Sequence, residues 1–280
     1  MTILVLTYDF ERYGNPSLPM NHAKNIQDRR FALNGLEIIL RIHKKHDVGG
    51  TIFILGRLLE LCNKEIKELF SKYLIDIQQH TYSHILFKKD NYRRRMPSSP
   101  LEIKHEIEIT NNLIKKYLDV DVIGLSAPIG FHNGLKDEKE ILKILEKEGI
   151  KFIKSDSRGP GNELPGPFID NGRLKQPYFY ENGILELTGQ GWHDCIIKGL
   201  IPHERPKKVV NNPFEELRYY INDLNFAIKN NLIYSPTFHP WSIAMKDPKG
   251  FVIDNLIAYA IKNNVEIISA SELYHKIKRL

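Results

Sequence analysis

The chain has 280 residues, of which 42% are hydrophobic and 26% are charged. This length suffices to bury a sizeable core, and the composition excludes disordered, collagen-like and coiled-coil proteins. The 40 basic and 34 acidic residues give a formal net charge of +6. Because the basic residues are spread along the chain, apart from the run Arg93, Arg94 and Arg95, the charge pattern argues against nucleic-acid binding.

Short apolar runs alternate along the chain with longer amphipathic stretches, which is the pattern of strands that take turns with helices. Most of the expected strands are separated by one helix, as in parallel β/α units. The pattern predicts strands at residues 3–8, 51–55, 74–79, 122–125, 151–155, 184–187, 232–238 and 265–269, and helices at residues 33–46, 63–72, 100–117, 137–148, 213–230, 251–263 and 271–278.

The helix expected at residues 100–117 has the clearest start signal. Ser99 can be its N-cap, Pro100 occupies the first helical position and Glu102 completes a capping box. Seven or eight β/α units in one chain, without a GxGxxG after the first strand, favour an α/β parallel barrel over an open dinucleotide-binding sheet. We interpret residues 1–280 as one domain, with a long loop at 159–182 over one end of the barrel.

In a parallel barrel the reactive groups lie at the C-terminal ends of the strands. Asp9 and Glu11 follow the first expected strand, and His80 and His84 follow the third. Two histidines and a carboxylate are the usual ligands of a hydrolytic zinc site. One carboxylate would ligate the metal and the other would take a proton from water. The alternatives are two surface histidines on a turn and an exposed acidic turn.

Two further polar residues follow later strands. His239 comes after the seventh strand and can protonate a leaving group near neutral pH, or it can be a core histidine packed beside Trp241. Asp156 comes after the fifth strand. It can hydrogen-bond such a histidine and set its tautomer, or it can cap the turn at residues 157–159.

Several of these segments resemble the polysaccharide deacetylases of the NodB-homology type, carbohydrate esterase family 4. The most specific is QHTYSH at residues 79–84, which matches the family's H-[ST]-x-x-H motif. The others, in chain order, are TYDFE at 7–11, similar to the TFDDG motif in its D-x-E form; GTIFILG at 50–56, similar to the ATFFVxG strand; APIG at 127–130 and SDS at 155–157, similar to the third and fourth motifs; and FHPW at 238–241, similar to the HPW form of the last motif.

The resemblance implies a distorted (β/α)7 barrel that hydrolyses the acetamide of an amino sugar. Position by position, it makes His80 and His84 metal ligands with Glu11 as the third, Asp9 the base and His239 the general acid. The metal is expected to be divalent, zinc first, with Co²⁺, Mn²⁺ or Fe²⁺ as alternatives. We expect contacts with the substrate from Pro128, Arg158, Trp192 and Trp241.

The chain departs from the family pattern at two places. Leu125 or Ser126 stands where the third motif usually has an arginine that pairs with the catalytic aspartate, so the guanidinium would have to come from Arg158 or Arg30. Phe10 replaces the usual adjacent metal-binding aspartate, which leaves the roles of the two flanking carboxylates open to exchange. Aromatic residues of the later loops can stack on a sugar or pack in the core: Tyr178, Phe179, Tyr180 and Trp192.

Two rival functions stay open. One keeps the site and changes the substrate, to the linear or cyclic amides of the allantoinase-like branch. The other is a catalytically silent barrel that acts as a binding protein. The missing third-motif arginine favours this second rival, and the complete set of expected ligands, base and acid opposes it.

The sequence also bears on location and partners. Cys62 and Cys195 form no CxxC pair, so we expect both to be reduced. The apolar run at residues 3–6 is too short for an export signal, and no segment approaches the roughly 18 apolar residues of a membrane span. We therefore expect a cytoplasmic protein with a small-molecule or oligosaccharide substrate. A homo-oligomer stays an open alternative.

Overall fold

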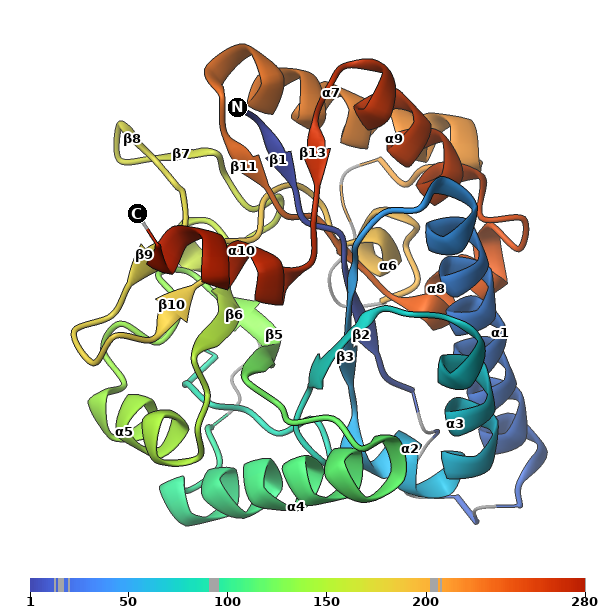
Figure 1. Ribbon diagram of the computed structural model, residues 1–280, viewed down its shortest axis with the longest axis vertical. Coiled ribbons are helices and arrows are strands. Elements are labelled where there is room, and N and C mark those ends of the chain that lie inside the picture. Colours follow the sequence, from blue (N-terminus) through green and yellow to red (C-terminus); the bar gives the residue numbers. More distant parts are fainter. Residues whose placement is uncertain are drawn as a thin grey trace.

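The computed structural model of the protein describes residues 1–12, 14, 18–19, 21–90, 96–201, 206 and 208–279. The basic run Arg93, Arg94 and Arg95 lies outside the described residues. A curled sheet with helices packed around it forms the centre of the fold (Figure 1). Within the described part of the chain, none of the helices is both long and apolar enough to cross a membrane.

Seven parallel strands and one antiparallel edge strand form the main sheet. The open order and the curl agree with the predicted distorted (β/α)7 barrel, so the expected fold class is confirmed. In spatial order the strands are β12 (Thr237–Phe238), β2 (Thr7–Phe10), β3 (Thr51–Ile54), β4 (Asp76–Gln79), β5 (Gly124–Phe131), β6 (Phe152–Asp156), β10 (Leu185–Glu186) and the antiparallel β9 (Tyr178–Phe179).

Two of the predicted strands are each divided between two sheets. Residues 3–8 become β1 (Ile3–Leu4) and then β2, and residues 232–238 become β11 (Ile233–Tyr234) and then β12. β1 lies between β11 and β13 (Glu266–Ile267) in a separate parallel sheet. Pro236 lies at the break between β11 and β12, where its missing N–H cannot serve a continuous ladder.

Ten α-helices are described, and seven of them correspond to predicted ones. The capping box of α4 is present as expected, with the Ser99 hydroxyl accepting from the Glu102 N–H. The helices are α1 (Ala23–His46), α2 (Gly56–Leu61), α3 (Asn63–Lys72), α4 (Pro100–Leu118), α5 (Lys139–Lys147), α6 (Asp194–Ile197), α7 (Pro213–Asn230), α8 (Pro240–Lys246), α9 (Phe251–Lys262) and α10 (Ala270–Lys278). The short helices α2, α6 and α8 were not predicted, and α1 begins earlier than expected.

Helix α1 packs closely against α8, which begins directly after the expected general acid His239. A Cβ atom placed on Gly35 of α1 would lie 1.8 Å from the carbonyl oxygen of Pro240. Only a residue without a side chain allows this approach. Gly35 therefore sets how closely α8 packs on α1, and with it the position of the chain at His239.

The segment 159–182 is less irregular than the predicted loop. It contains the 3₁₀ turn η1 (Pro160–Asn162), the hairpin of β7 (Ile169–Asp170) with β8 (Arg173–Leu174), and the edge strand β9. Its Lys175 and Asp170 contact residues at the ends of β6 and β5, so the segment does pack against the C-terminal end of the sheet.

Candidate active site

Side chains from three strand ends meet at one edge of the main sheet. Asp9 lies near the end of β2, His80 directly follows β4 and His239 directly follows β12. Tyr8 pairs with Phe238 and Phe10 with Ile54, so these parallel strands end side by side. The predicted clustering at this edge is therefore observed in the structure.

Glu11, His80 and His84 form a tight cluster of possible metal ligands. Glu11 Oε2 lies 2.8 Å from His84 Nε2 and 3.5 Å from His80 Nε2. The carbonyl oxygen of Ser126 lies 2.8 Å from His80 Nδ1. Because a carbonyl only accepts hydrogen bonds, Nδ1 carries the proton and Nε2 presents its lone pair to the cluster.

The two histidines are brought together by a turn and not by a helix. Thr81 and His84 both have left-handed backbones, with φ of 59° and 66°. Glu106 of α4 accepts from the N–H groups of Tyr82 and Ser83 at 3.0 and 2.6 Å and fixes this turn. The ring centroids of His80 and His84 are 5.1 Å apart as a result. The sequence showed the ligand spacing but gave no signal for the anchoring role of Glu106.

The donor atoms of this cluster fit a divalent metal ion. His80 Nε2 is buried and has no hydrogen-bond partner within the described residues, which is the state of a nitrogen reserved for a ligand. Burial alone would raise the pKa of Glu11, but the imidazoles of His84 and His80 lower it well below the usual range. Glu11 is thus an anion beside two imidazole nitrogens, which is the ligand set of hydrolytic zinc sites.

Asp9 lies beside this cluster but is not part of it. Its Oδ1 is 4.0 Å from His80 Nδ1, and this oxygen is buried without a hydrogen-bond partner in the part of the chain that the structure describes. The side chain lines the cavity at the strand ends. Glu11 is therefore the carboxylate that contacts both histidines, whereas Asp9 faces the cavity beside them.

The imidazole of His239 is held by Asp194 and not by Asp156. Its Nδ1 lies 2.7 Å from Asp194 Oδ1, and the ammonium of Lys198 lies 3.2 Å from Asp194 Oδ2. Lys198 is also 3.1 Å from Glu216 Oε1. The pKa of His239 would be lowered by burial alone, but Cys195 and Asp194 raise it well above the usual value. The expectation that Asp156 orients this histidine is wrong.

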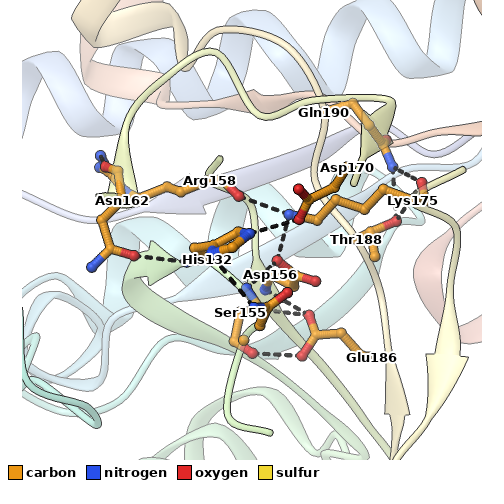
Figure 2. Close-up of polar contacts among 12 residues, drawn as sticks. His132, Ser155, Asp156, Arg158, Asn162, Asp170, Lys175, Glu186, Thr188 and Gln190 are labelled. Atoms are coloured by element: carbon orange, nitrogen blue, oxygen red, sulfur yellow. Dashed lines mark hydrogen bonds and ion pairs between the residues drawn. The ribbon is translucent and has the colours of Figure 1, made fainter. Parts of the chain in front are cut away.

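Asp156 belongs to a separate buried network at the ends of β5 and β6 (Figure 2). Its Oδ1 lies 2.5 Å from the ammonium of Lys175 and accepts from the Asn133 N–H at 2.9 Å. Neither contact caps the turn at residues 157–159, so the second interpretation of Asp156 is also wrong. The 159–182 segment supplies Lys175 as the counter-ion of Asp156. The sequence did not predict this ion pair, because its two residues are far apart along the chain.

A cavity of about 590 Å³ opens at the strand ends. Arg158 lines it, as expected of a substrate-binding residue. Among the residues that the structure describes, Pro128, Trp192 and Trp241 are not part of its lining. The cavity is lined by Asp9, Glu11, His84, Ser126, Ala127, Ile129, Gly130, Lys154, Ser157, Arg158, His193, Cys195, Ile196, Ile201, Thr237 and His239.

The three residues outside the lining have other contacts. Trp241 is buried, and its indole N–H points to Glu11 Oε1 at 3.4 Å. Trp192 is half-buried against the main core, and its carbonyl accepts from the Tyr220 hydroxyl at 3.4 Å. Pro128 is buried within β5. The expected contacts of these three residues with a substrate stay predictions.

A buried lysine, which the sequence interpretation missed, lies where the family's arginine is absent. Lys154 of β6 lines the cavity with Asp9 and donates to the Thr7 hydroxyl and to the Pro236 carbonyl, the latter at 3.2 Å. Burial lowers its pKa to about 8, against the opposing effect of the Asp9 carboxylate. Arg158 donates to the Ile129 carbonyl at 3.0 Å. Arg30 is exposed on α1.

Tyr178, Phe179 and Tyr180, for which sugar stacking and core packing were both open, line a different cavity of about 430 Å³. Asp156 also lines this second cavity, and its Oδ2 lies 3.4 Å from the Tyr178 hydroxyl. The rings of Tyr178 and Tyr180 pack edge to face, with centroids 5.4 Å apart. These aromatics are therefore placed away from the histidine cluster.

Solved structures share this fold at low sequence identity. A Mycobacterium smegmatis protein assigned as a polysaccharide deacetylase has a TM-score of 0.77 over 99% of this chain and 90% of its own, at 15% identity. The Puue allantoinase has a TM-score of 0.65 over 98% of this chain and 88% of its own, at 13% identity. A CE4 family pseudoenzyme from Bacillus anthracis has a TM-score of 0.56 over 97% and 65%, at 16% identity.

The sequence itself matches one protein family. Residues 34–153 match the family described as polysaccharide deacetylase, a span that contains His80 and His84 and ends before His239. A search of curated proteins gave no match. The NodB-type resemblance is thereby confirmed, whereas the D-x-E and HPW branch stays a prediction. Residues 34–153 of this chain are thus similar to the polysaccharide deacetylase family, and the chain shares the fold of solved proteins with that description.

Proposed function

We propose that this protein is a metal-dependent hydrolase that removes an acetyl or similar acyl group from the nitrogen of an amino sugar. The observation that carries the proposal is the convergence of Glu11, His80 and His84 next to a free carboxylate, Asp9, and a charged imidazole, His239, at one cavity. Metal ligands, a base and an acid are the groups that amide hydrolysis needs.

The metal would be held by Glu11 Oε2 and by the Nε2 atoms of His80 and His84. We infer zinc, because two imidazoles and one carboxylate are its usual ligands in hydrolases, with Co²⁺, Mn²⁺ or Fe²⁺ as alternatives. When bound, such an ion polarises an amide carbonyl and makes nearby water more acidic. Trp241 and Ser126 orient the ligand side chains through the contacts described above.

Asp9 and His239 divide the proton transfers between them. Asp9 is a carboxylate with an unused buried oxygen facing the cavity, so it can accept a proton from the attacking water. His239 is held in its protonated form by Asp194, so it can give a proton to the departing amine. Asp9 Oδ1 lies 4.0 Å from His80 Nδ1, and His239 Nε2 lies 3.9 Å from Glu11 Oε1.

Two cations of the cavity wall fit an acyl substrate. Lys154 and Asp9 line the same cavity, and the Asp9 carboxylate acts on the charge of Lys154. Lys154 can therefore supply the positive charge that the missing family arginine would place near the aspartate. Arg158 lines the same cavity from the segment after β6. Positive groups fixed in a buried site stabilise a carboxylate and the negative charge that develops on an amide oxygen.

The site draws on residues from Asp9 to His239, which supports a single functional domain over residues 1–280. The substrate we infer is a small molecule or short oligosaccharide with an N-acyl group. A cavity of about 590 Å³ has the size of sites that hold such ligands. We also infer a cytoplasmic location, and neither nucleic acid nor membrane enters the proposal.

Metal content of the purified protein tests the proposal. Mass spectrometry should find about one equivalent of a transition metal in the wild type and none in the variant His80→Ala, His84→Ala. The matched control is His105→Ala, His275→Ala, which removes two exposed histidines from helix surfaces and should keep the metal. The loaded protein should then release acetate from N-acetyl sugars and leave cyclic ureides such as allantoin unchanged.

Two results would refute the proposal. A wild type that binds no zinc, cobalt, manganese or iron after incubation with each ion lacks the hydrolytic site. A metal-loaded protein that cleaves cyclic or linear amides, and no N-acyl sugar, has the proposed site with a different substrate.

A further inference from the structure

A thiol lies beside the proposed general acid, and the mechanism does not use it. Cys195 is the second residue of α6, is 4% exposed and lines the cavity. Its sulfur is 4.0 Å from His239 Nε2. Asp194, Cys195 and His239 each offer one ligand atom, and these atoms lie within 4.8 Å of one another. A thiolate and an imidazole at this separation are zinc ligands.

The orientation of His239 favours a ligand at Nε2. Its Nδ1 faces Asp194 Oδ1 at 2.7 Å, and Lys198 in turn neutralises Asp194. A histidine that binds a metal through one nitrogen almost always gives its other N–H to a carboxylate in this way. The other nitrogen, Nε2, faces the Cys195 sulfur at 4.0 Å.

Two further donors lie close to His239. Glu11 Oε1 lies 3.9 Å from His239 Nε2, while the other oxygen of this carboxylate faces His84. His193 lines the same cavity, and its Nε2 is buried without a hydrogen-bond partner within the described residues. Its ring centroid is 6.1 Å from that of His239. An unpaired imidazole nitrogen at nine-tenths burial is an independent sign that a ligand belongs there.

We propose that Cys195 and His239 form a second zinc site, distinct from the Glu11, His80 and His84 site, through which excess zinc inhibits the enzyme. When the ion binds, the Cys195 thiol and the Nε2–H of His239 each release a proton to solvent. The ion takes the Nε2 position from which His239 would protonate the departing amine, so an enzyme with both sites filled cannot complete the reaction. Thiolate selects zinc and cobalt over magnesium and manganese, so the latter two should not inhibit.

Cobalt titration of metal-free protein tests the site without any assay of activity. A cobalt–thiolate bond gives a charge-transfer absorption in the near ultraviolet. We expect this absorption in the wild type and in His80→Ala, His84→Ala, and its loss in Cys195→Ser and Cys195→Ala. The matched control is Cys62→Ser, because Cys62 is an equally buried thiol at the junction of α2 and α3 and should not alter the absorption.

Inhibition of the hydrolase activity by zinc is the second test of the site, and it rests on the proposed function. Raising zinc above one equivalent should inhibit the wild type, and Cys195→Ser should need roughly 10–100-fold more zinc, at least the loss that follows removal of an outer partner of a metal ligand. Absence of the cobalt–thiolate absorption, or its survival in both Cys195 variants, overturns the second site. If the absorption behaves as expected and no N-acyl substrate is cleaved, the site is supported and the proposed function alone fails.

Discussion

Replacing Asp194 with asparagine should shift the pH dependence of the reaction. The Asp194 carboxylate is fully buried, and its pKa, which burial would raise, is lowered by Lys198 and His239. It therefore stays charged and supports the protonated form of His239. Asparagine keeps an oxygen that accepts the Nδ1–H of His239 but carries no charge. The substitution thus tests the charge while it retains the tautomer.

The size of the shift follows from the contact. A hydrogen bond at 2.7 Å to a charged group is worth about 1.5–3 kcal/mol, against roughly 0.5–1.5 kcal/mol for a neutral one. The difference of about 1–2 kcal/mol corresponds to a fall of roughly one pKa unit for His239, at about 1.4 kcal/mol per unit. Lys198 stays paired with Glu216 at 3.1 Å, so the change leaves no isolated buried charge.

The direction of the change is fixed by the role of the histidine. A general acid works only in its protonated form, so activity falls as the pH rises through the raised pKa of His239. Lowering that pKa moves the alkaline limb of kcat/KM to lower pH by about one unit. At a pH above the alkaline limbs of both proteins, kcat/KM of Asp194→Asn should be about 10-fold lower than that of the wild type.

The assay measures kcat/KM for acetate release over a pH range that covers the acidic and the alkaline limbs of the profile. Glu216→Gln is the control, because it removes the other partner of Lys198 without contacting His239. It should leave the alkaline limb in place. A uniform loss of activity in Asp194→Asn, with an unmoved alkaline limb, would refute an electrostatic role for Asp194.

Three further predictions concern other parts of the fold. Burial raises the pKa of Glu186 to about 7, so the stability that this group contributes is present below its unfolded pKa and lost as the pH rises through 7. In the wild type, the free energy of unfolding in urea should therefore fall by about 3 kcal/mol more between pH 4.5 and pH 8 than it does in Glu186→Gln. An equal fall in both proteins would contradict this. Gly35→Ala, whose Cβ would meet the Pro240 carbonyl, should destabilise the protein by about 3 kcal/mol or more in thermal unfolding, whereas the exposed neighbour Asn34→Ala should not. Lys154→Met should lower kcat/KM at least about 10-fold, and full activity would show that this cation is dispensable.

Periodicity and capping were sufficient to predict most of the elements. The helices α3 and α7 have their predicted bounds, and the capping box at Ser99 fixes the start of α4. The divided strands were harder to predict, since an unbroken apolar run such as residues 3–8 does not show where the chain passes from one sheet to another. Pro240 at the first position of α8 was a usable signal for a helix that the interpretation left out.

The candidate site likewise contains residues that the sequence predicted and residues that it did not. Residues at strand ends were predictable, because parallel strands bring their C-terminal ends to one edge. The partner of His239 was not, since Asp194 lies on a four-residue helix in a segment without hydrophobic periodicity. Asp156 was the wrong choice because a strand-end carboxylate also suits a structural ion pair, here with Lys175.

Overall similarity cannot decide whether this barrel is catalytic. The wild-type Bacillus anthracis pseudoenzyme and its mutant with restored enzymatic activity both have a TM-score of 0.56 and 16% identity to this chain. Two proteins of opposite activity are thus equally similar to it, so the backbone carries no information on the question. The difference must lie in side chains at the strand ends. There Glu11, His80 and His84 cluster, Asp194 holds His239, and Asp9 and the buried Lys154 line the same cavity. A catalytic barrel is the interpretation that gives each of these buried charges a reason to be there.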